Sequence, residues 1–183
     1  EETWVPMYDL AEKLHLQDYN VVMFDYGFAS PDHKAVTGGK QESQELLGAI
    51  DVAKRRGAKE IYIWGFSMGA GTALQTALYS KDIDGMILDS TFILEPDTLY
   101  YNIKQYINLP RNPSLSLIRW SFPFLNGTSL SQIPYKEVKN KSYDMPIFMI
   151  HSTRDEKAPY QLAEAISHKQ QVSSGDNFWL VDD

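Results

Sequence analysis

Two kinds of hydrophobic pattern alternate along the chain. Short runs of consecutive apolar residues, such as Val21–Phe24, are typical of strands buried on both faces. Between these runs, apolar residues recur every three or four positions, which is typical of helices that bury one side. The sequence therefore predicts an α/β fold with a mostly parallel sheet and helices on both faces.

The two patterns also give approximate boundaries for the elements. The predicted helices cover Trp4–Asp18, Gln41–Arg56 and Tyr160–Gln171, with a further helix directly after Gly69. The predicted strands cover Asn20–Tyr26, Ile61–Trp64, Gly85–Asp89, Met145–Ile150 and Asn177–Val181. At 183 residues, the chain is expected to form a single domain, residues 1–183.

Residues 91–143 interrupt this alternation. The stretch is rich in proline and in aromatic residues, and it is too long for a tight connection. Long insertions of this kind often lie over the ends of strands and act as lids or as walls of a binding site. We expect a short helical cap over the active site, with the alternative that its aromatic side chains simply cover the sheet.

The sequence Gly65-Phe66-Ser67-Met68-Gly69 lies where a predicted strand gives way to a predicted helix. A G-x-S-x-G pattern in that position is typical of a nucleophile elbow, in which a sharp turn exposes the serine at the end of the sheet. The following helix directs its first N–H groups toward developing negative charge. Ser67 is therefore the candidate nucleophile; the alternative is a glycine-rich turn with an incidental serine.

Composition narrows the chemistry that the chain can support. The net charge is −7, and no stripe of Lys and Arg indicates a nucleic-acid partner. The absence of cysteine excludes disulfides, thiol catalysis and thiolate metal sites within these residues. No H-x-x-x-H or H-E-x-x-H pair, phosphate-binding P-loop or dinucleotide motif is present, so we expect neither a metal nor a cofactor.

The two ends of the chain leave its location open. No apolar run approaches the roughly 20 residues that span a bilayer, and no signal-peptide pattern is present. The chain starts at Glu1 without methionine and stops at Asp183, directly after a predicted strand. We expect both ends to be truncated, so membrane association and localisation are not fixed by this sequence.

A second motif, His151-Ser152-Thr153-Arg154-Asp155-Glu156-Lys157-Ala158-Pro159, follows a predicted strand. Together with the elbow, it resembles the α/β-hydrolase superfamily, in particular its esterase, lysophospholipase and serine-peptidase-like branch. The corresponding family loop is H-G-x-x-D-x-x-V-P. Serine replaces its glycine and alanine replaces its valine in this chain, both mild departures.

The resemblance implies roles for particular residues. It makes Asp155 the acid of a Ser-His-Asp triad and gives Met68 N–H as one oxyanion donor. It also implies that the catalytic histidine lies past Asp183 and that the second oxyanion donor precedes Glu1. Asp89, at the end of the preceding predicted strand, is the alternative acid.

The four histidines of the chain are weaker candidates for the base. His15 is expected in a helix and His33 in a loop, both in solvent. His168 falls on the outer surface of a helix, and His151 matches a structural position of the family loop. For each of the four, a structural role is the preferred interpretation, with His151 kept as an alternative base.

These residues predict a serine hydrolase that cleaves an acyl bond of a small molecule. The aromatic cap favours an apolar acyl group, so a carboxylic ester is the first expectation and a peptide or thioester the second. The alternative from a different class is a non-catalytic binding module that has the same fold and lacks a working base.

Overall fold

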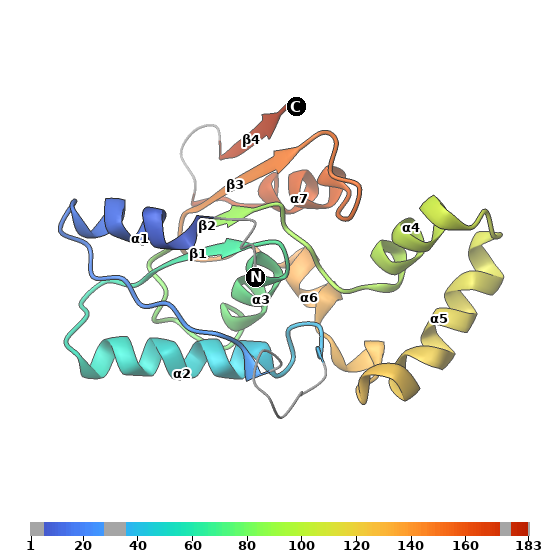
Figure 1. The fold of residues 1–183 in the computed structure, drawn as a ribbon, viewed down its shortest axis with the longest axis horizontal. Helices are drawn as coiled ribbons and strands as arrows, with labels where there is room; N and C mark the ends of the chain where they lie inside the picture. Colours follow the sequence, from blue (N-terminus) through green and yellow to red (C-terminus); the bar gives the residue numbers. More distant parts are fainter. Residues whose placement is uncertain (1–5, 28–35, 173–176, 183) are drawn as a thin grey trace.

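A parallel sheet of four strands, in the order β1-β2-β3-β4, forms the centre of the protein (Figure 1). We describe it from a computed structural model, which covers residues 6–27, 36–172 and 177–182. The strands are β1 (Tyr62–Phe66), β2 (Gly85–Asp89), β3 (Ile147–Ser152) and β4 (Phe178–Val181). All neighbouring pairs are parallel, so their carboxyl ends share one edge of the sheet. The predicted α/β class is confirmed.

Helices connect the strands. They are α1 (Met7–His15), α2 (Glu42–Arg55), α3 (Met68–Thr76), α4 (Pro96–Tyr106), α5 (Arg111–Asn126), α6 (Tyr135–Asn140), α7 (Tyr160–Ser167) and a short 3-10 helix, η2 (Leu130–Gln132). The predicted boundaries agree to within a few residues for α2, β2 and β3. The α7 helix stops earlier than the apolar spacing predicts, and β1 extends through Gly65 to Phe66.

The main core lies on one face of the sheet. Alternate residues of the central strands point into it: Met86 and Leu88 from β2, and Ile147 and Met149 from β3, are all buried. Helices supply the opposing apolar side chains, which are Leu46 and Ile50 of α2, Ala70, Ala73 and Leu74 of α3, Val138 of α6, and Ala163 and Ile166 of α7. On the other face of β3, Phe148 remains 38% exposed.

The predicted strand Asn20–Tyr26 is wrong for this structure. The segment has no helix or strand assignment before Gly27, and the described sheet contains only the four strands above. Its apolar side chains are 39–48% exposed at Val21, Val22 and Met23 and 40% exposed at Phe24. An apolar run forms a strand only when a neighbouring strand accepts its backbone hydrogen bonds, and such pairing cannot be seen in local sequence.

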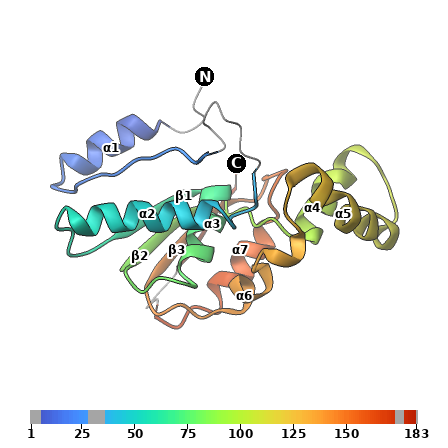
Figure 2. The ribbon, with the colours of Figure 1, turned by 90° about the horizontal axis from the view of Figure 1, so that it is seen from below.

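The helices α4, α5 and α6 and the 3-10 helix η2 lie between residues 91 and 143, where the sequence predicts a cap, and we call this unit the cap. Figures 1 and 2 show α4 and α5 standing to one side of the sheet. The cap has a small core of its own, which consists of Leu94, Leu115, Ile118, Phe122, Leu130 and Ile133. The α5 helix ends at Asn126 and is capped by Gly127, whose φ of 66° is the left-handed conformation that glycine adopts easily. None of the helices in the described ranges has the length and apolar content to cross a membrane.

Candidate active site

Ser67 lies between the end of β1 and the start of α3. Its φ of 50° and ψ of −116° make it one of the few non-glycine residues with positive φ in the described chain, and its side chain is exposed. Such backbone strain persists only where the surrounding structure enforces it, and it concentrates at functional sites. The geometry is that of a nucleophile elbow, in the place where the sequence pattern predicts one.

Backbone hydrogen bonds hold this turn in place. The Ser67 amide donates to the Asp89 carbonyl at 2.9 Å, and the Ser67 carbonyl accepts from the Phe92 amide at 3.1 Å and from the Ala70 amide at 3.1 Å. One of these three bonds reaches the last residue of β2, and a second reaches the segment that follows it. The serine is therefore fixed by the neighbouring strand as well as by its own helix.

The glycines around the elbow differ in how closely neighbouring atoms approach them. A Cβ added at Gly65 would lie 2.8 Å from both the amide nitrogen and the Cα of Ala70, so this position has no room for a side chain. At Gly69 the nearest atom would be the Tyr26 hydroxyl at 3.9 Å, which leaves room for a side chain. The closest approach is instead at Gly71, where a Cβ would lie 2.2 Å from the Phe92 carbonyl oxygen. The α3 helix therefore meets the segment after β2 at Gly71, two residues beyond Gly69.

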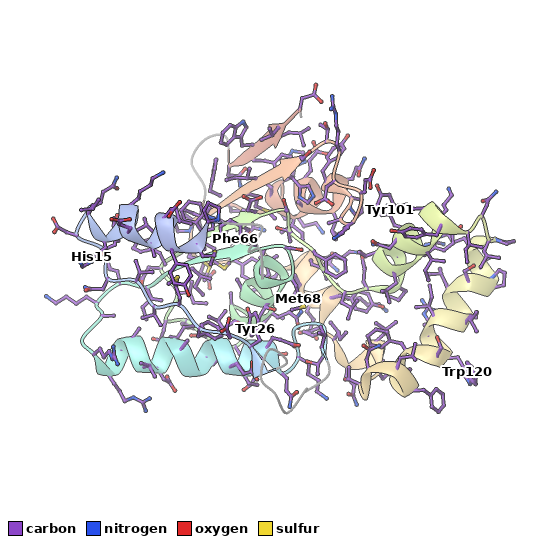
Figure 3. All side chains as sticks on the ribbon, viewed as in Figure 1. His15, Tyr26, Phe66, Met68, Tyr101 and Trp120 are labelled. Carbon is purple, nitrogen blue, oxygen red and sulfur yellow. The ribbon has the colours of Figure 1, made fainter. Side chains whose placement is uncertain are left out.

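Met68 is the first residue of α3, immediately after the serine. The first N–H groups of a helix have no intrahelical acceptor, so the Met68 N–H is available to an external one. Tyr26 also lies near this end of α3, as Figure 3 shows. Burial raises the pKa of the Tyr26 phenol above its usual value, and the charges of Glu42 and Glu45 raise it further, so the hydroxyl is neutral at physiological pH.

Asp155 lies in the loop after β3, and its carboxylate is held in a defined orientation. Oδ1 accepts hydrogen bonds from the amides of Lys157 and Ala158, both at 2.8 Å. Oδ2 lies 3.3 Å from His151 Nε2, and the side chain is 16% exposed. The sheet register joins Phe66 to Asp89 and continues to β3, so Ser67 and Asp155 follow strands separated by one neighbour at the same sheet edge.

His151 is fully buried beneath this loop. Its Nε2 lies 3.0 Å from the Ala158 carbonyl oxygen, which can only accept, so this contact requires the proton on Nε2. Its Nδ1 is buried and has no hydrogen-bond partner in the described structure. The ring therefore ties the two ends of the Asp155 loop together, which supports the structural interpretation over a role as base.

The other sequence candidates have local roles or lie on the surface. Asp89 Oδ1 accepts a hydrogen bond from Ser90 Oγ at 2.9 Å, which is the turn-stabilising arrangement of an acid beside a serine. His15 and His168 are exposed, and His33 lies outside the described residues. No group of three or more His, Asp or Glu side chains that could hold a metal ion occurs in the described part of the chain.

The cap contacts the acid loop through α4, a feature that the sequence does not reveal. The side chains of Tyr101, Asn102 and Gln105 donate hydrogen bonds to the three successive carbonyls of residues 155–157. The Tyr101 bond measures 3.4 Å and the Asn102 bond 2.7 Å. Figure 3 places Tyr101 on the side of the cap that faces the sheet. These polar residues share one side of α4, but local sequence gives no signal of their partners about 50 residues away.

Comparisons with known proteins agree with this geometry. No protein-family model matches the chain. Similar sequences include lysophosphatidylserine lipase ABHD12 from Danio rerio, 26% identical over 81% of this chain and 38% of that protein, and the same lipase from Macaca fascicularis, 28% identical over 86% and 39%. The chain thus spans about two fifths of the length of these curated relatives.

Solved structures of similar fold include a monoacylglycerol lipase from Paleococcus ferrophilus, with a TM-score of 0.64 and 15% identity, covering 96% of this chain and 77% of that one. The esterase Pf2001 from Pyrococcus furiosus also has a TM-score of 0.64, with 24% identity, covering 96% of this chain and 65% of that one. The parallel sheet, the strained serine and these similarities define an α/β-hydrolase fold.

Proposed function

We propose that this protein is a serine hydrolase that cleaves a carboxylic ester with an apolar acyl group. The observation that carries the proposal is Ser67, exposed in strained backbone at the carboxyl end of a parallel strand and at the start of a helix. The names of the similar proteins, which are lipases and an esterase, support the same reaction class.

In the proposed reaction, Ser67 Oγ attacks the ester carbonyl carbon while its proton passes to a histidine. The carbonyl oxygen becomes an oxyanion, and the Met68 N–H at the start of α3 donates to it. Collapse of this intermediate breaks the bond to the alcohol, which leaves with the proton from the histidine. Water then attacks the acyl-enzyme by the same route in reverse and releases the carboxylic acid.

The third member of the triad is proposed from the family resemblance. Asp155 Oδ1 is occupied by two backbone amides, whereas Oδ2 has only the longer contact to His151 and is the oxygen that can orient a catalytic imidazole. In this proposal, the histidine comes from sequence outside residues 1–183. The buried ring of His151 supports the loop from below.

The test is hydrolysis of a series of aryl esters with short and long acyl chains by the full-length gene product. We expect turnover that increases with the length of the acyl chain and falls about 10⁴-fold or more in the Ser67→Ala variant. Residual turnover above about one per cent in that folded variant would reject Ser67 as nucleophile, because a triad serine contributes far more than that. Faster cleavage of a matched amide or thioester would reject the ester and leave the serine mechanism intact.

A further inference from the structure

The cap differs in charge from the rest of the chain. Residues 98–136 contain no Asp or Glu, although the chain as a whole has 24 acidic residues. The same stretch contains the basic residues Lys104, Arg111, Arg119 and Lys136, which leaves the remaining sequence with 13 basic residues against 24 acidic ones. Residues 98–136, the larger part of the cap, are therefore a cationic region on an acidic protein, a distribution that attracts anionic surfaces.

Most of this positive charge is not neutralised within the protein. Arg111 pairs with Asp97 at 2.5 Å, where the acidic residue comes from the base of the cap. In the described ranges, none of Lys104, Arg119 and Lys136 has an acidic partner, and all three are exposed. Three solvated cations on one small unit remain available to an external partner.

The α5 helix is apolar on two opposite sides. One side carries Leu115, Ile118 and Phe122, which are buried in the core of the cap. The opposite side carries Leu117, Trp120 and Phe124, which are 57%, 68% and 77% exposed. We call these three residues the outer stripe. Their spacing of three and four residues places them in one line along the helix, because a helix turns by about 100° per residue.

The outer stripe is a continuous surface. The rings of Trp120 and Phe124 contact each other, with centroids 5.4 Å apart. Figure 3 shows Trp120 on the far side of α5, pointing away from Met68 and the elbow. Folding of the cap does not require these side chains, because the opposite side of α5 already supplies its core. An exposed stripe of large apolar residues on a folded protein marks an interaction surface.

The combination of a tryptophan-containing apolar stripe with exposed cations fits one kind of partner. Amphipathic helices that lie on membranes insert Trp, Phe and Leu at the headgroup boundary while their Lys and Arg bind anionic lipids. A second copy of this chain is a poor occupant, because two caps placed face to face would bring like charges together. We propose that the outer stripe docks the protein onto lipid surfaces that carry anionic headgroups. This proposal concerns binding alone and does not depend on catalysis by Ser67.

A label on α5 tests the proposal locally. Residues 1–183 contain no cysteine, so Ser116→Cys gives a single labelling site beside the stripe for an environment-sensitive fluorophore, any cysteine elsewhere in the full-length protein being replaced by serine. We expect a blue shift with vesicles of phosphatidylcholine containing about 30% phosphatidylglycerol and none with pure phosphatidylcholine. The matched control is Lys59→Cys, exposed in the α2–β1 connection at the opposite end of the molecule (Figure 1), where no shift is expected.

Substitutions then separate the two components of binding. Trp120→Ser with Phe124→Ser should weaken vesicle binding about tenfold or more, and Arg119→Gln should weaken it about fivefold. Arg56→Gln, which removes an exposed charge far from the cap, should leave binding unchanged, as should Ser67→Ala. Thermal unfolding should be the same for all variants because the residues are exposed.

Three outcomes would overturn the proposal. The first is equal binding to neutral and anionic vesicles. The second is binding that survives loss of both aromatic residues in a folded protein. The third is a blue shift at position 116 that appears without vesicles and rises with protein concentration, which would show that a second copy covers the stripe.

Discussion

The sheet and the cap use apolar residues in different ways. At the centre of the sheet and in the helix packed against it, the apolar side chains of Leu74, Leu88 and Met149 are fully buried. In the cap, Phe122 is 7% exposed while Phe124, two residues later on the same helix, is 77% exposed. Apolar content alone therefore does not show which residues form a core. The sheet holds chemical groups in place, whereas the cap also presents an apolar surface to the exterior.

Among the substitutions that compare the sheet with the cap, the one expected to lower activity most is at Asp155, the proposed acid in the loop after β3. Asp155→Asn should lower ester hydrolysis about 10³- to 10⁴-fold, because the amide no longer stabilises the imidazolium or its tautomer. The amide oxygen can still accept from the loop amides, so folding should be preserved. Steady-state kinetics on the full-length protein, with circular dichroism of the variant, measures both.

The matched control is Asp89→Asn, which should retain activity within about tenfold, because Ser90 Oγ is the one donor to the Asp89 side chain within the described ranges. The reverse result, with Asp89→Asn nearly inactive and Asp155→Asn nearly unaffected, would identify Asp89, at the end of β2, as the catalytic acid.

The two phenylalanines of α5 test the comparison within the cap. Phe122→Ala should reduce the free energy of unfolding by about 3 to 5 kcal/mol if the cap unfolds together with the sheet, because it leaves a cavity in the core of the cap. Phe124→Ala should change it by less than about 0.5 kcal/mol, because the ring is exposed. Urea denaturation of both variants gives the two values. Equal losses would mean that the outer side of α5 is covered in solution.

Alanine substitutions at two glycines distinguish the effect of steric crowding on stability from the effect of helix propensity. Gly71→Ala should destabilise the protein by up to about 3 kcal/mol, because the added methyl would overlap the Phe92 carbonyl that lies 2.2 Å away. Gly48→Ala, in α2 with no atom within 4 Å of the added Cβ, should stabilise it by roughly 0.5–1 kcal/mol. The free energy of unfolding again provides the measurement. A neutral Gly71→Ala variant would contradict the close packing of α3 against the post-β2 segment.

The smallest effect concerns the contact between the cap and the acid loop. Asn102→Ala removes the 2.7 Å bond to the Lys157 carbonyl and should cost about 1 kcal/mol, with a few-fold lower kcat as the Asp155 loop loosens. Asn140→Ala is the control: it removes exposed bonds to the Lys136 carbonyl within α6 and from Lys169 Nζ, both away from the acid loop, and should leave kcat unchanged. An identical kcat in both variants would show that the contact between α4 and the acid loop does not help to position Asp155.

Local sequence predicts the elbow well because all of its determinants are adjacent. The strand, the serine and the helix lie within residues 62–76, and the motif states where the turn must be. It predicts β2 and β3 for a similar reason, since both are short apolar runs with loops on each side. The same criterion fails for Val21–Phe24, where the run is as apolar but has no strand beside it in the described sheet.

What the sequence does not show depends on distant contacts. Gly71, rather than Gly69, is the crowded position because a segment about 20 residues later crosses it. The bonds from α4 to the acid loop join residues about 50 positions apart. The two sides of α5 look alike as sequence, because both are apolar at helical spacing, and only packing decides which of them is covered. The role of Asp155 remains a prediction that the kinetic comparison above can test.

Whether Ser67 is an activated nucleophile is tested most directly by mass spectrometry of the full-length protein after exposure to a fluorophosphonate, which reacts with activated serines. We expect a single adduct on the peptide that contains Ser67. The adduct should be absent from Ser67→Ala and retained in Ser90→Ala, whose serine also has positive φ but lies at the end of β2 without a helix behind it. No adduct on the folded parent protein would reject Ser67 as an activated nucleophile and favour a binding module with this fold. An adduct that persists in Ser67→Ala would also reject Ser67 as the reactive serine.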